Sequence, residues 1–273
     1  MSEFKDRVAV ITGGASGIGA CMARAFAERG ARLVLADIDR DALARAEQEH
    51  VDQGTEVLAV PTDVTQREEV FALADAAWKH FGAVHILCNN AGVATYGDIA
   101  RAPAEDWEFT MNVNFWGVAY GVQAFVPRLI EQDAGGHIVN TASMAGLVGM
   151  SWLGIYNASK FAVVGLSESL FRELRPRGIG VSVLCPMVVE TNLDATTAKN
   201  RPQHLQPTGE VAPQPSASDI QGTVKQPEEV ALRVVRAIER KQLYVPTHDE
   251  QREILKRRAA RLDAAFEPEN WDL

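Results

Sequence analysis

The sequence has few cysteines and no metal-binding pattern. Three cysteines occur in 273 residues, Cys21, Cys88 and Cys185. None belongs to a Cys-x-x-Cys pair or stands at metal-ligand spacing from a histidine, which excludes a disulfide framework and a cysteine-based zinc site. The six histidines lack ligand spacing as well, so we expect chemistry without a metal. Reduced thiols predict a cytoplasmic protein.

Basic charge and long hydrophobic runs are also scarce. The 27 Lys and Arg residues are outnumbered by 36 Asp and Glu residues, giving a formal net charge of -9. A chain of this charge repels nucleic acid and anionic membranes, so we expect neither as a partner. No run reaches about 18 apolar residues, and the first one, Val8 to Ile11, is too short for a signal peptide or a spanning helix.

What is present has the composition of a globular protein, with 47% hydrophobic and 23% charged residues. We interpret residues 1–273 as a single domain. Short β-branched runs alternate with helical patterns, which predicts an α/β fold with a doubly wound, mostly parallel sheet of seven strands flanked by helices. Strands are expected at 8–11, 32–36, 56–60, 85–88, 137–141, 180–184 and 243–245. Helices are expected at 20–29, 40–52, 66–81, 104–132, 153–175, 227–241 and 249–266.

A glycine-rich turn joins the first strand to the first helix. Glycines permit a tight turn and close backbone approach to a ligand, and a helix N-terminus offers free N–H groups and partial positive charge to a pyrophosphate. The turn therefore predicts a dinucleotide site, although its spacing differs from the commoner G-x-G-x-x-G. Its residues are Thr12, Gly13, Gly14, Ala15, Ser16, Gly17, Ile18 and Gly19.

The second strand ends on Asp37, about 20 residues beyond the glycines. A carboxylate there can accept hydrogen bonds from a ribose diol and would repel a 2′-phosphate, so we expect NAD, with NADP disfavoured. The alternative role for Asp37 is to cap the helix at 40–52. Asp39 is better placed for that role.

Tyr156 and Lys160 stand four residues apart in a helical pattern, which places their side chains on one face of the helix. A lysine beside a tyrosine stabilises the phenolate and brings its pKa down from about 10 toward working pH. Such a tyrosine can transfer a proton. A pair this short can also arise by chance, so its meaning depends on the residues around it.

Taken in order, these motifs resemble the short-chain dehydrogenase/reductase family from Arg7 to Val245. The glycine turn is similar to the family's T-G-x-x-x-G-x-G cofactor turn, and residues 89–92 are similar to its N-N-A-G strand end. The catalytic tetrad implied by the resemblance is Asn114, Ser143, Tyr156 and Lys160. The cofactor-binding residues that it implies are Thr12, Gly13, Ser16, Gly17, Ile18, Gly19, Asp37, Ile38, Asp63, Val64, Asn90, Ala91, Gly92, Tyr156, Lys160, Pro186 and Thr191.

The resemblance implies hydride transfer between nicotinamide C4 and the carbon of a secondary alcohol or ketone. Tyr156 would take or give the hydroxyl proton, and Ser143 would hydrogen-bond the substrate oxygen. Lys160 would lower the pKa of Tyr156 and hold the nicotinamide ribose. Asn114 would position the long helix and a water through which Lys160 exchanges protons.

Two features distinguish the expected substrate side. The family usually has glycine after Pro186, and Met187 stands there instead, which should narrow or reshape the pocket. Residues 188–226 are rich in proline and polar residues and are expected to form an irregular lid, with a helical extension at 246–273.

The wall expected around the substrate is apolar and lacks a basic cluster, which favours a hydrophobic, aromatic or polycyclic substrate. The residues expected around it are Tyr96, Ala145, Leu147, Met150, Leu153 and Met187.

The helical patterns at 104–132 and 153–175 are apolar nearly all round, which predicts a homo-oligomer. The resemblance implies a dimer or a tetramer built on these two helices. Two other functions stay open. One is an NADPH-dependent reductase of carrier-bound or polyketide-like ketones, against which Asp37 argues. The other is a dinucleotide-sensing or scaffold protein without chemistry, against which the complete tetrad argues.

Overall fold

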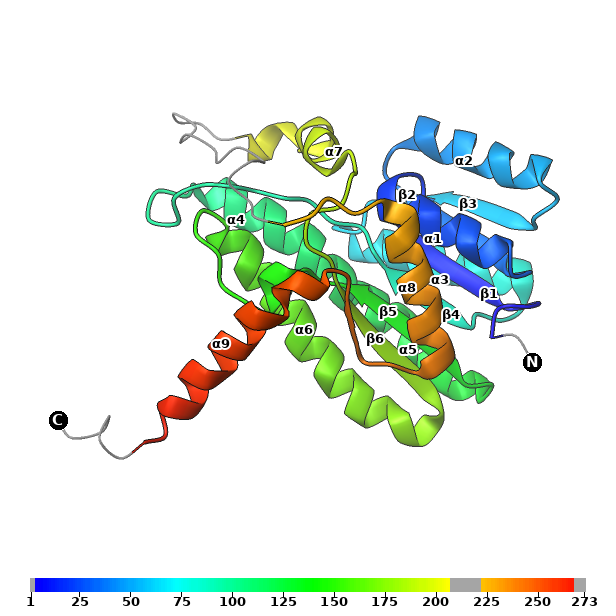
Figure 1. Ribbon diagram of the computed structural model, residues 1–273. Coiled ribbons are helices and arrows are strands. Elements are labelled where there is room, and N and C mark those ends of the chain that lie inside the picture. Colours follow the sequence, from blue (N-terminus) through cyan, green and yellow to red (C-terminus); the bar gives the residue numbers. More distant parts are fainter. Residues whose placement is uncertain (1–2, 207–221, 268–273) are drawn as a thin grey trace.

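Seven parallel strands form one sheet in the order β3-β2-β1-β4-β5-β6-β7, with helices on both faces (Figure 1). The computed structural model describes residues 3–206 and 222–267. The central strands are buried along their whole length, as their runs of Val, Ile and Leu require. The strands are β1 (Val8–Thr12), β2 (Arg32–Asp37), β3 (Val57–Pro61), β4 (Ile86–Asn89), β5 (Gly136–Thr141), β6 (Ile179–Cys185) and β7 (Tyr244–Pro246).

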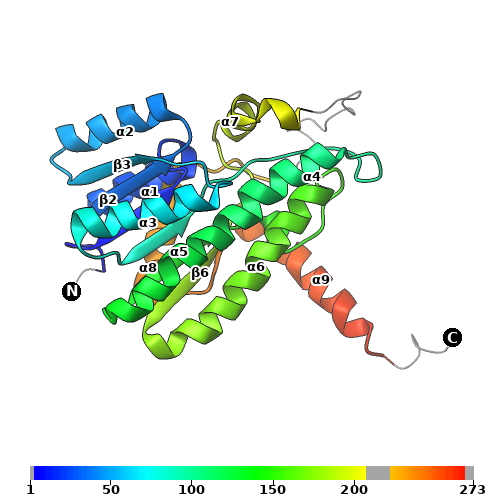
Figure 2. The same ribbon diagram turned by 180° about the vertical axis from the view of Figure 1, so that it is seen from behind.

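The expected doubly wound α/β fold is confirmed, and each strand lies within two residues of its predicted range. Helices α1, α2 and α8 cover one face of the sheet, and α3, α5 and α6 cover the other (Figure 2). The α-helices are α1 (Gly17–Ala27), α2 (Arg40–Asp52), α3 (Arg67–Phe81), α4 (Ala104–Met111), α5 (Gly117–Gln132), α6 (Gly154–Leu174), α7 (Leu193–Asn200), α8 (Pro227–Arg240) and α9 (Arg252–Ala264).

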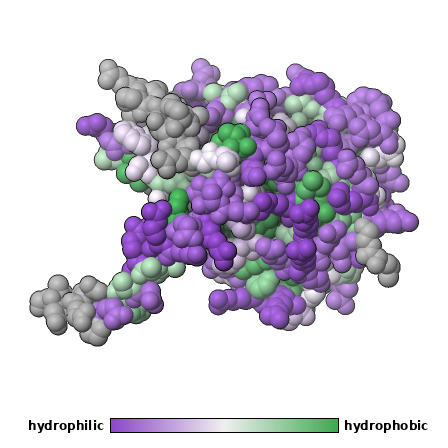
Figure 3. All heavy atoms as spheres, in the orientation of Figure 1, coloured by the Kyte–Doolittle hydropathy of each residue, from purple (hydrophilic) through white to green (hydrophobic). Residues whose placement is uncertain are grey.

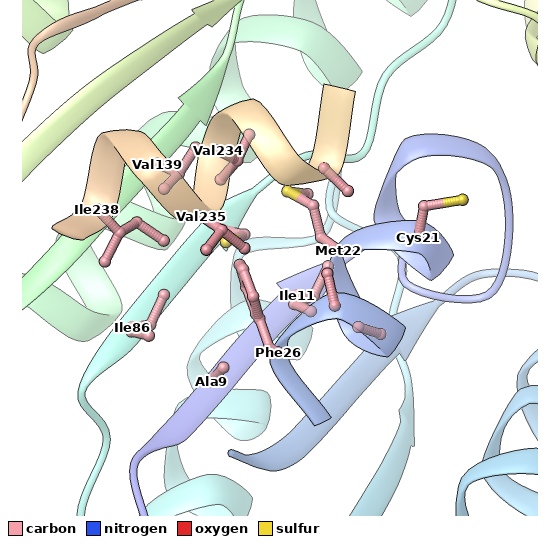
Figure 4. Close-up of a cluster of buried hydrophobic side chains, with 14 of the residues drawn as sticks. Ala9, Ile11, Cys21, Met22, Phe26, Ile86, Val139, Val234, Val235 and Ile238 are labelled. Atoms are coloured by element: carbon pink, nitrogen blue, oxygen red, sulfur yellow. The ribbon is translucent and has the colours of Figure 1, made fainter. Parts of the chain in front are cut away.

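The larger buried cluster on the first face joins α1 and α8 to the strands beneath them (Figure 4). Phe26 and Met22 of α1 are fully buried, and Val234 and Ile238 of α8 pack in the same cluster. Helix α8 begins with Pro227 at its first turn, as predicted. Residues far apart in the sequence thus hold the first strand and its glycine turn against the C-terminal part of the chain.

Two predicted elements differ in detail. The helix expected at 104–132 is continuous, but residues Asn112–Trp116 form a π-helical turn between α4 and α5. The stretch 188–226 was expected to be irregular, and this is wrong in part because α7 and a 3-10 turn at Gln203–Leu205 lie within it. Residues 207–221 of the expected lid lie outside the described residues.

Helix α9 projects from the body of the molecule, and its residues are exposed or half-buried (Figures 1 and 3). It lies within the range 246–273 that was expected to form a helical extension, of which residues 268–273 lie outside the described residues. In the face drawn in Figure 3, hydrophobic residues are scattered among hydrophilic ones. Within residues 3–206 and 222–267, no helix combines the length and apolar character needed to cross a lipid bilayer.

Candidate active site

The strand order reverses between β1 and β4, and the residues expected to bind the cofactor gather at the C-terminal ends of these strands. Ile11 pairs with Cys88 in this register. Beyond them, Asn90 Nδ2 donates to the Thr12 carbonyl oxygen at 3.1 Å. The Thr12 hydroxyl accepts from the amides of Asn90 and Ala91 at 2.9 and 3.1 Å. The two strand ends are therefore tied together where open parallel sheets bind ligands.

The glycine turn has room only for glycine at critical positions. Gly13 and Gly17 have φ of +63° and +52°, and a Cβ on Gly13 would lie 3.0 Å from the Ala91 Cα. A Cβ on Gly19 would lie 2.0 Å from the Gly13 carbonyl oxygen, so α1 packs directly on the turn. Among the described residues, the Ser16 side chain makes no capping hydrogen bond at the start of α1. The N–H groups there fit an anionic group such as a pyrophosphate.

Asp37 lines a cavity of about 150 Å³ beside this turn. Its carboxylate accepts hydrogen bonds from the amides of Ala15 and Asp39 at 3.1 and 3.0 Å. Burial raises the pKa of Asp37, and the two amides oppose the rise. Asp39, as expected, is the residue that caps α2, through the Ala42 amide. The same cavity is lined by Ile38, Asp63 and Val64.

A second cavity, of about 160 Å³, extends from the turn to the tetrad. Within the described chain, neither Thr12 nor Gly19 lines this cavity or the first one. Both lie behind the cavity wall, where Thr12 forms hydrogen bonds and Gly19 packs closely on the turn. The other predicted cofactor residues that line the second cavity are Gly13, Ser16, Gly17, Ile18, Asn90, Ala91, Gly92, Tyr156, Lys160, Pro186 and Thr191.

Asn114 lies in the π-helical turn and is fully buried. Its Oδ1 accepts from the Val93 amide at 2.9 Å, and its Nδ2 donates to the Val93 carbonyl at 3.0 Å and to Ser159 Oγ at 3.1 Å. A Cβ on Gly92 would come within 3.3 Å of Asn114 Oδ1 and 3.5 Å of Lys160 Nζ. Asn114 therefore joins the segment after β4 to α6, beside Lys160.

Ser143 follows β5, and Tyr156 lies in the first turn of α6. The Ser143 hydroxyl donates to the Pro186 carbonyl at 3.2 Å and accepts from the Ala145 amide at 3.1 Å, so it also caps the turn at Met144–Gly146. Both side chains line the second cavity and a third one next to it. They stand where the two cavities meet.

Lys160 is buried, and its Nζ donates to the Thr141 carbonyl at 3.0 Å and lies 5.5 Å from the centre of the Tyr156 ring. Burial lowers the pKa of Lys160 to about 8. Burial raises the pKa of Tyr156, hydrogen bonding to Ser143 opposes the rise, and the charge of Asp194 adds to it. The expected lowering of the Tyr156 pKa by Lys160 is therefore wrong for this arrangement, because loss of solvation dominates.

The third cavity has a volume of about 200 Å³ and contains most of the residues expected around the substrate. Tyr96, Ala145, Met150, Leu153 and Met187 all line it. Leu147 does not belong to its lining within the described residues. Its side chain packs on the cluster around Val118 and Val163 instead, because the turn after Ser143 directs it into the core.

Two residues were missed: Asp194, which lines this cavity, and His248, which bonds the cavity-lining residue Val188. Asp194 of α7 accepts a hydrogen bond from the Tyr96 hydroxyl at 3.2 Å. The buried His248 bonds the carbonyl oxygens of Val188 and Thr223 at 3.1 and 2.9 Å through Nε2. An acidic residue in the first turn of α7 and Lys199 in its last turn are helix signals that could have revealed this helix. For His248 no local pattern exists, since its partners are distant in sequence.

Comparisons with known proteins agree with this geometry. The family model described as short chain dehydrogenase matches residues 7–202. A crystal structure of a short-chain dehydrogenase/reductase from Burkholderia phymatum in complex with NAD superposes with a TM-score of 0.91, at 40% identity and 98% coverage of both chains.

Two curated relatives cover most of the chain. A CLA biosynthesis dehydrogenase/reductase from Lactiplantibacillus plantarum is 35% identical over 96% of this chain and 95% of its own length. A C alpha-dehydrogenase from Sphingobium sp. strain NBRC 103272 / SYK-6 is 34% identical over 94% of this chain and 85% of its own. The protein belongs to the short-chain dehydrogenase/reductase family and is an oxidoreductase that acts on CH–OH groups.

Proposed function

We propose that this protein is an NAD-dependent dehydrogenase or reductase of a hydrophobic secondary alcohol or ketone. The observation that carries the proposal is the meeting of two cavities at Ser143 and Tyr156. One cavity begins at the glycine turn, and the other is walled mainly by apolar side chains. A substrate in the apolar cavity presents its oxygen to the two hydroxyl groups.

NAD, when bound, supplies the site that accepts or releases a hydride. The glycine turn and the N-terminus of α1 would hold its pyrophosphate, and the Asp37 carboxylate would accept from its adenosine ribose. Ser143 donates to the substrate oxygen. Tyr156 gives its proton to that oxygen in reduction and, once ionised, takes the proton in oxidation. Burial raises the pKa of Tyr156, so the phenol is neutral in the free protein.

The preference for NAD over NADP rests on Asp37. The amides of Ala15 and Asp39 fix the Asp37 carboxylate in place. The 2′-phosphate of NADP would lie against this carboxylate, and the two negative charges would repel each other at low dielectric. Rates with the two coenzymes should therefore favour NAD. Asp37→Ala should lower that preference by about 10- to 100-fold, the value of losing a charged hydrogen-bonding group. An unchanged ratio would contradict the assignment of Asp37.

The substrate class is tested by a panel of secondary alcohols and their ketones. Aryl and polycyclic members should be turned over with higher kcat/KM than small polyols or sugars, because Met150, Leu153 and Met187 offer them apolar contact. Turnover confined to polyols or sugars would sink the proposal. The relative from Sphingobium, a C alpha-dehydrogenase, is 34% identical to this chain over 261 residues.

We further propose that the single domain assembles as a dimer or tetramer in the cytoplasm. Trp107 and Trp116 expose 37% and 43% of their surface on α4 and the π-helical turn, and Trp116 stacks on Tyr120 at 5.7 Å. Exposed aromatic groups of this kind support a subunit contact. Light scattering should give two or four chains per particle, and Trp116→Glu should reduce that number. The three cysteines are free and buried, as in a reducing compartment.

A further inference from the structure

The third cavity contains a second polar pair besides the hydroxyl groups of Ser143 and Tyr156. Among the described residues that line it, Asp194 is the one charged side chain. Tyr96 donates its phenolic hydrogen to the Asp194 Oδ1 at 3.2 Å. Burial and then the Asp194 charge raise the pKa of Tyr96, so Tyr96 stays a neutral donor. The remaining wall is largely apolar, which makes this pair distinct within the cavity.

The pair comes from two separate segments. Tyr96 belongs to the segment after β4, and Asp194 belongs to the first turn of α7. The same helix is tied down by Ala94, whose amide donates to Thr197 Oγ1 at 3.1 Å, and by Lys199, which pairs with Asp39 at 2.6 Å. Asp194 is therefore carried by a helix that is anchored on both sides of the active site. A carboxylate held in this way has a defined position toward a bound molecule.

A carboxylate oxygen has several acceptor sites, and one donor from Tyr96 occupies only part of them. A bound molecule would replace the water around Asp194 and would have to supply a donor, since an unpaired charge is costly to desolvate. A hydroxyl or amino group meets this need. A carboxylate on the bound molecule would be repelled.

We propose that Asp194, held by Tyr96, binds a hydroxyl or amino group of the substrate other than the reacting one and disfavours substrates with a carboxylate at that position. This inference rests on the proposed function. It narrows the substrate class from hydrophobic alcohols to those with an apolar body and a second hydrogen-bond donor.

The test uses the full-length protein, NAD and secondary aryl alcohols that differ only in the group opposite the carbinol. That group is a hydroxymethyl, a methoxymethyl or a carboxylate, on spacers of one to four carbons. At the best spacer, kcat/KM should be about tenfold higher for hydroxymethyl than for methoxymethyl and lowest for the carboxylate. In Asp194→Asn, the first ratio should fall below about threefold, and the carboxylate should gain activity.

Two further variants separate charge from structure. Tyr96→Phe keeps the Asp194 charge but removes its hydrogen bond, so discrimination against the carboxylate should persist while the preference for the donor falls. Asp263→Asn makes the same chemical change on exposed α9 and should leave all ratios at their wild-type values.

Equal ratios in the wild type and Asp194→Asn, or no preference for hydroxymethyl at any spacer, would overturn the inference while the proposed function stands. If the wild type oxidises none of these alcohols, including the unsubstituted parent, the proposed function fails and the inference falls with it. The two failures are thus told apart by the parent alcohol.

Discussion

The cofactor side and the substrate side of the active site differ in how much of each is formed by backbone and how much by side chains. The cofactor side consists largely of backbone at the ends of β1 and β4, with glycines where a Cβ would collide with the chain. The substrate side consists of side chains from segments that follow β4, β5 and β6, with α7 above them. The first is fixed by the sheet itself. The second depends on side chains that can change without altering a strand.

This difference explains why relatives with varied substrates share one fold. The family model ends at residue 202, within the segment between β6 and α8. The glycine turn, the strand ends and the tetrad all lie inside the matched range, whereas His248 lies beyond it. A change of substrate requires only new side chains around an unchanged hydride-transfer site.

The largest effect should come from the residue that both sides share. Tyr156→Phe removes the proton donor and keeps the ring, so turnover should fall by about 10²- to 10⁴-fold while NAD binding changes little. Steady-state rates and NAD titration by calorimetry measure the two effects. The matched control is Tyr244→Phe on the exposed end of β7, which should keep full activity. A Tyr156→Phe protein with normal turnover would mean that another group moves the proton.

The comparison predicts opposite results for two glycine-to-alanine changes in helices. Gly19→Ala places a Cβ 2.0 Å from the Gly13 carbonyl oxygen and should reduce the free energy of unfolding by about 1–3 kcal/mol and weaken NAD binding. In Gly165→Ala in α6, the added Cβ meets no described atom within 4 Å, so the free energy of unfolding should rise by about 0.5–1 kcal/mol. Denaturant titration measures both. Equal effects would break the claim that the cofactor side is limited by backbone contact.

Lys160 lies between the two sides, and its burial should cost stability. Its pKa is about 8 in the folded protein and 10.5 in the unfolded reference. Between these values the unfolded chain binds the extra proton, so the stability of the wild type rises with pH. Near pH 7, Lys160→Met should therefore be more stable than the wild type. The expected gain is about 2 kcal/mol once the cost of losing the hydrogen bond to Thr141 is subtracted.

This advantage should shrink as pH rises from 8 toward 10.5. Urea titrations at pH 7, 8, 9 and 10 test the trend. Lys79→Met, at an exposed position of α3, is the control and should shift stability by less than about 0.5 kcal/mol at every pH. A constant difference between Lys160→Met and the wild type would show that the lysine is charged in the folded protein throughout.

The smallest effect should be confined to the substrate side. Met187 lines the second and third cavities and takes a position where the family usually has glycine. Met187→Gly should enlarge the substrate cavity and raise the kcat/KM ratio of bulky to small alcohols by about three- to tenfold. The Kd for NAD should stay within about twofold. A larger loss of NAD binding than of substrate discrimination would place Met187 on the cofactor side instead.

The same division decides how much could be predicted from sequence. The strands, the glycine turn and the cap at Asp39 follow local rules of hydrophobic run, φ and side-chain acceptor, so they were predicted in the right places. The position of Asp37 at the cavity beside the turn follows from the end of β2. These features depend on residues that are close in sequence.

Other features depend on partners far apart in the chain. The Leu147 side chain packs in the core against the cluster around Val118 and Val163. No local sequence pattern predicts this contact. The pKa of Tyr156 is raised mainly by burial, which the spacing of Tyr156 and Lys160 does not reveal. Helix α7 was not predicted because the sequence around it is polar, and the position of Asp194 on that helix was therefore not predicted either. Burial and long-range pairing are what sequence reasoning could not supply.

His248 has a consequence for how the substrate side can evolve. Its ring holds the carbonyl groups of Val188 and Thr223, and Lys225 bonds Val188 and Glu190 through its backbone, so both ends of the intervening segment are closed. The entropy of closing a loop grows only with the logarithm of its length, by about 0.6 kcal/mol for each doubling. The segment between these ends can therefore change in length at little entropic cost, whereas Thr191 and Asp194, which belong to it and line the cavities, would have to be kept.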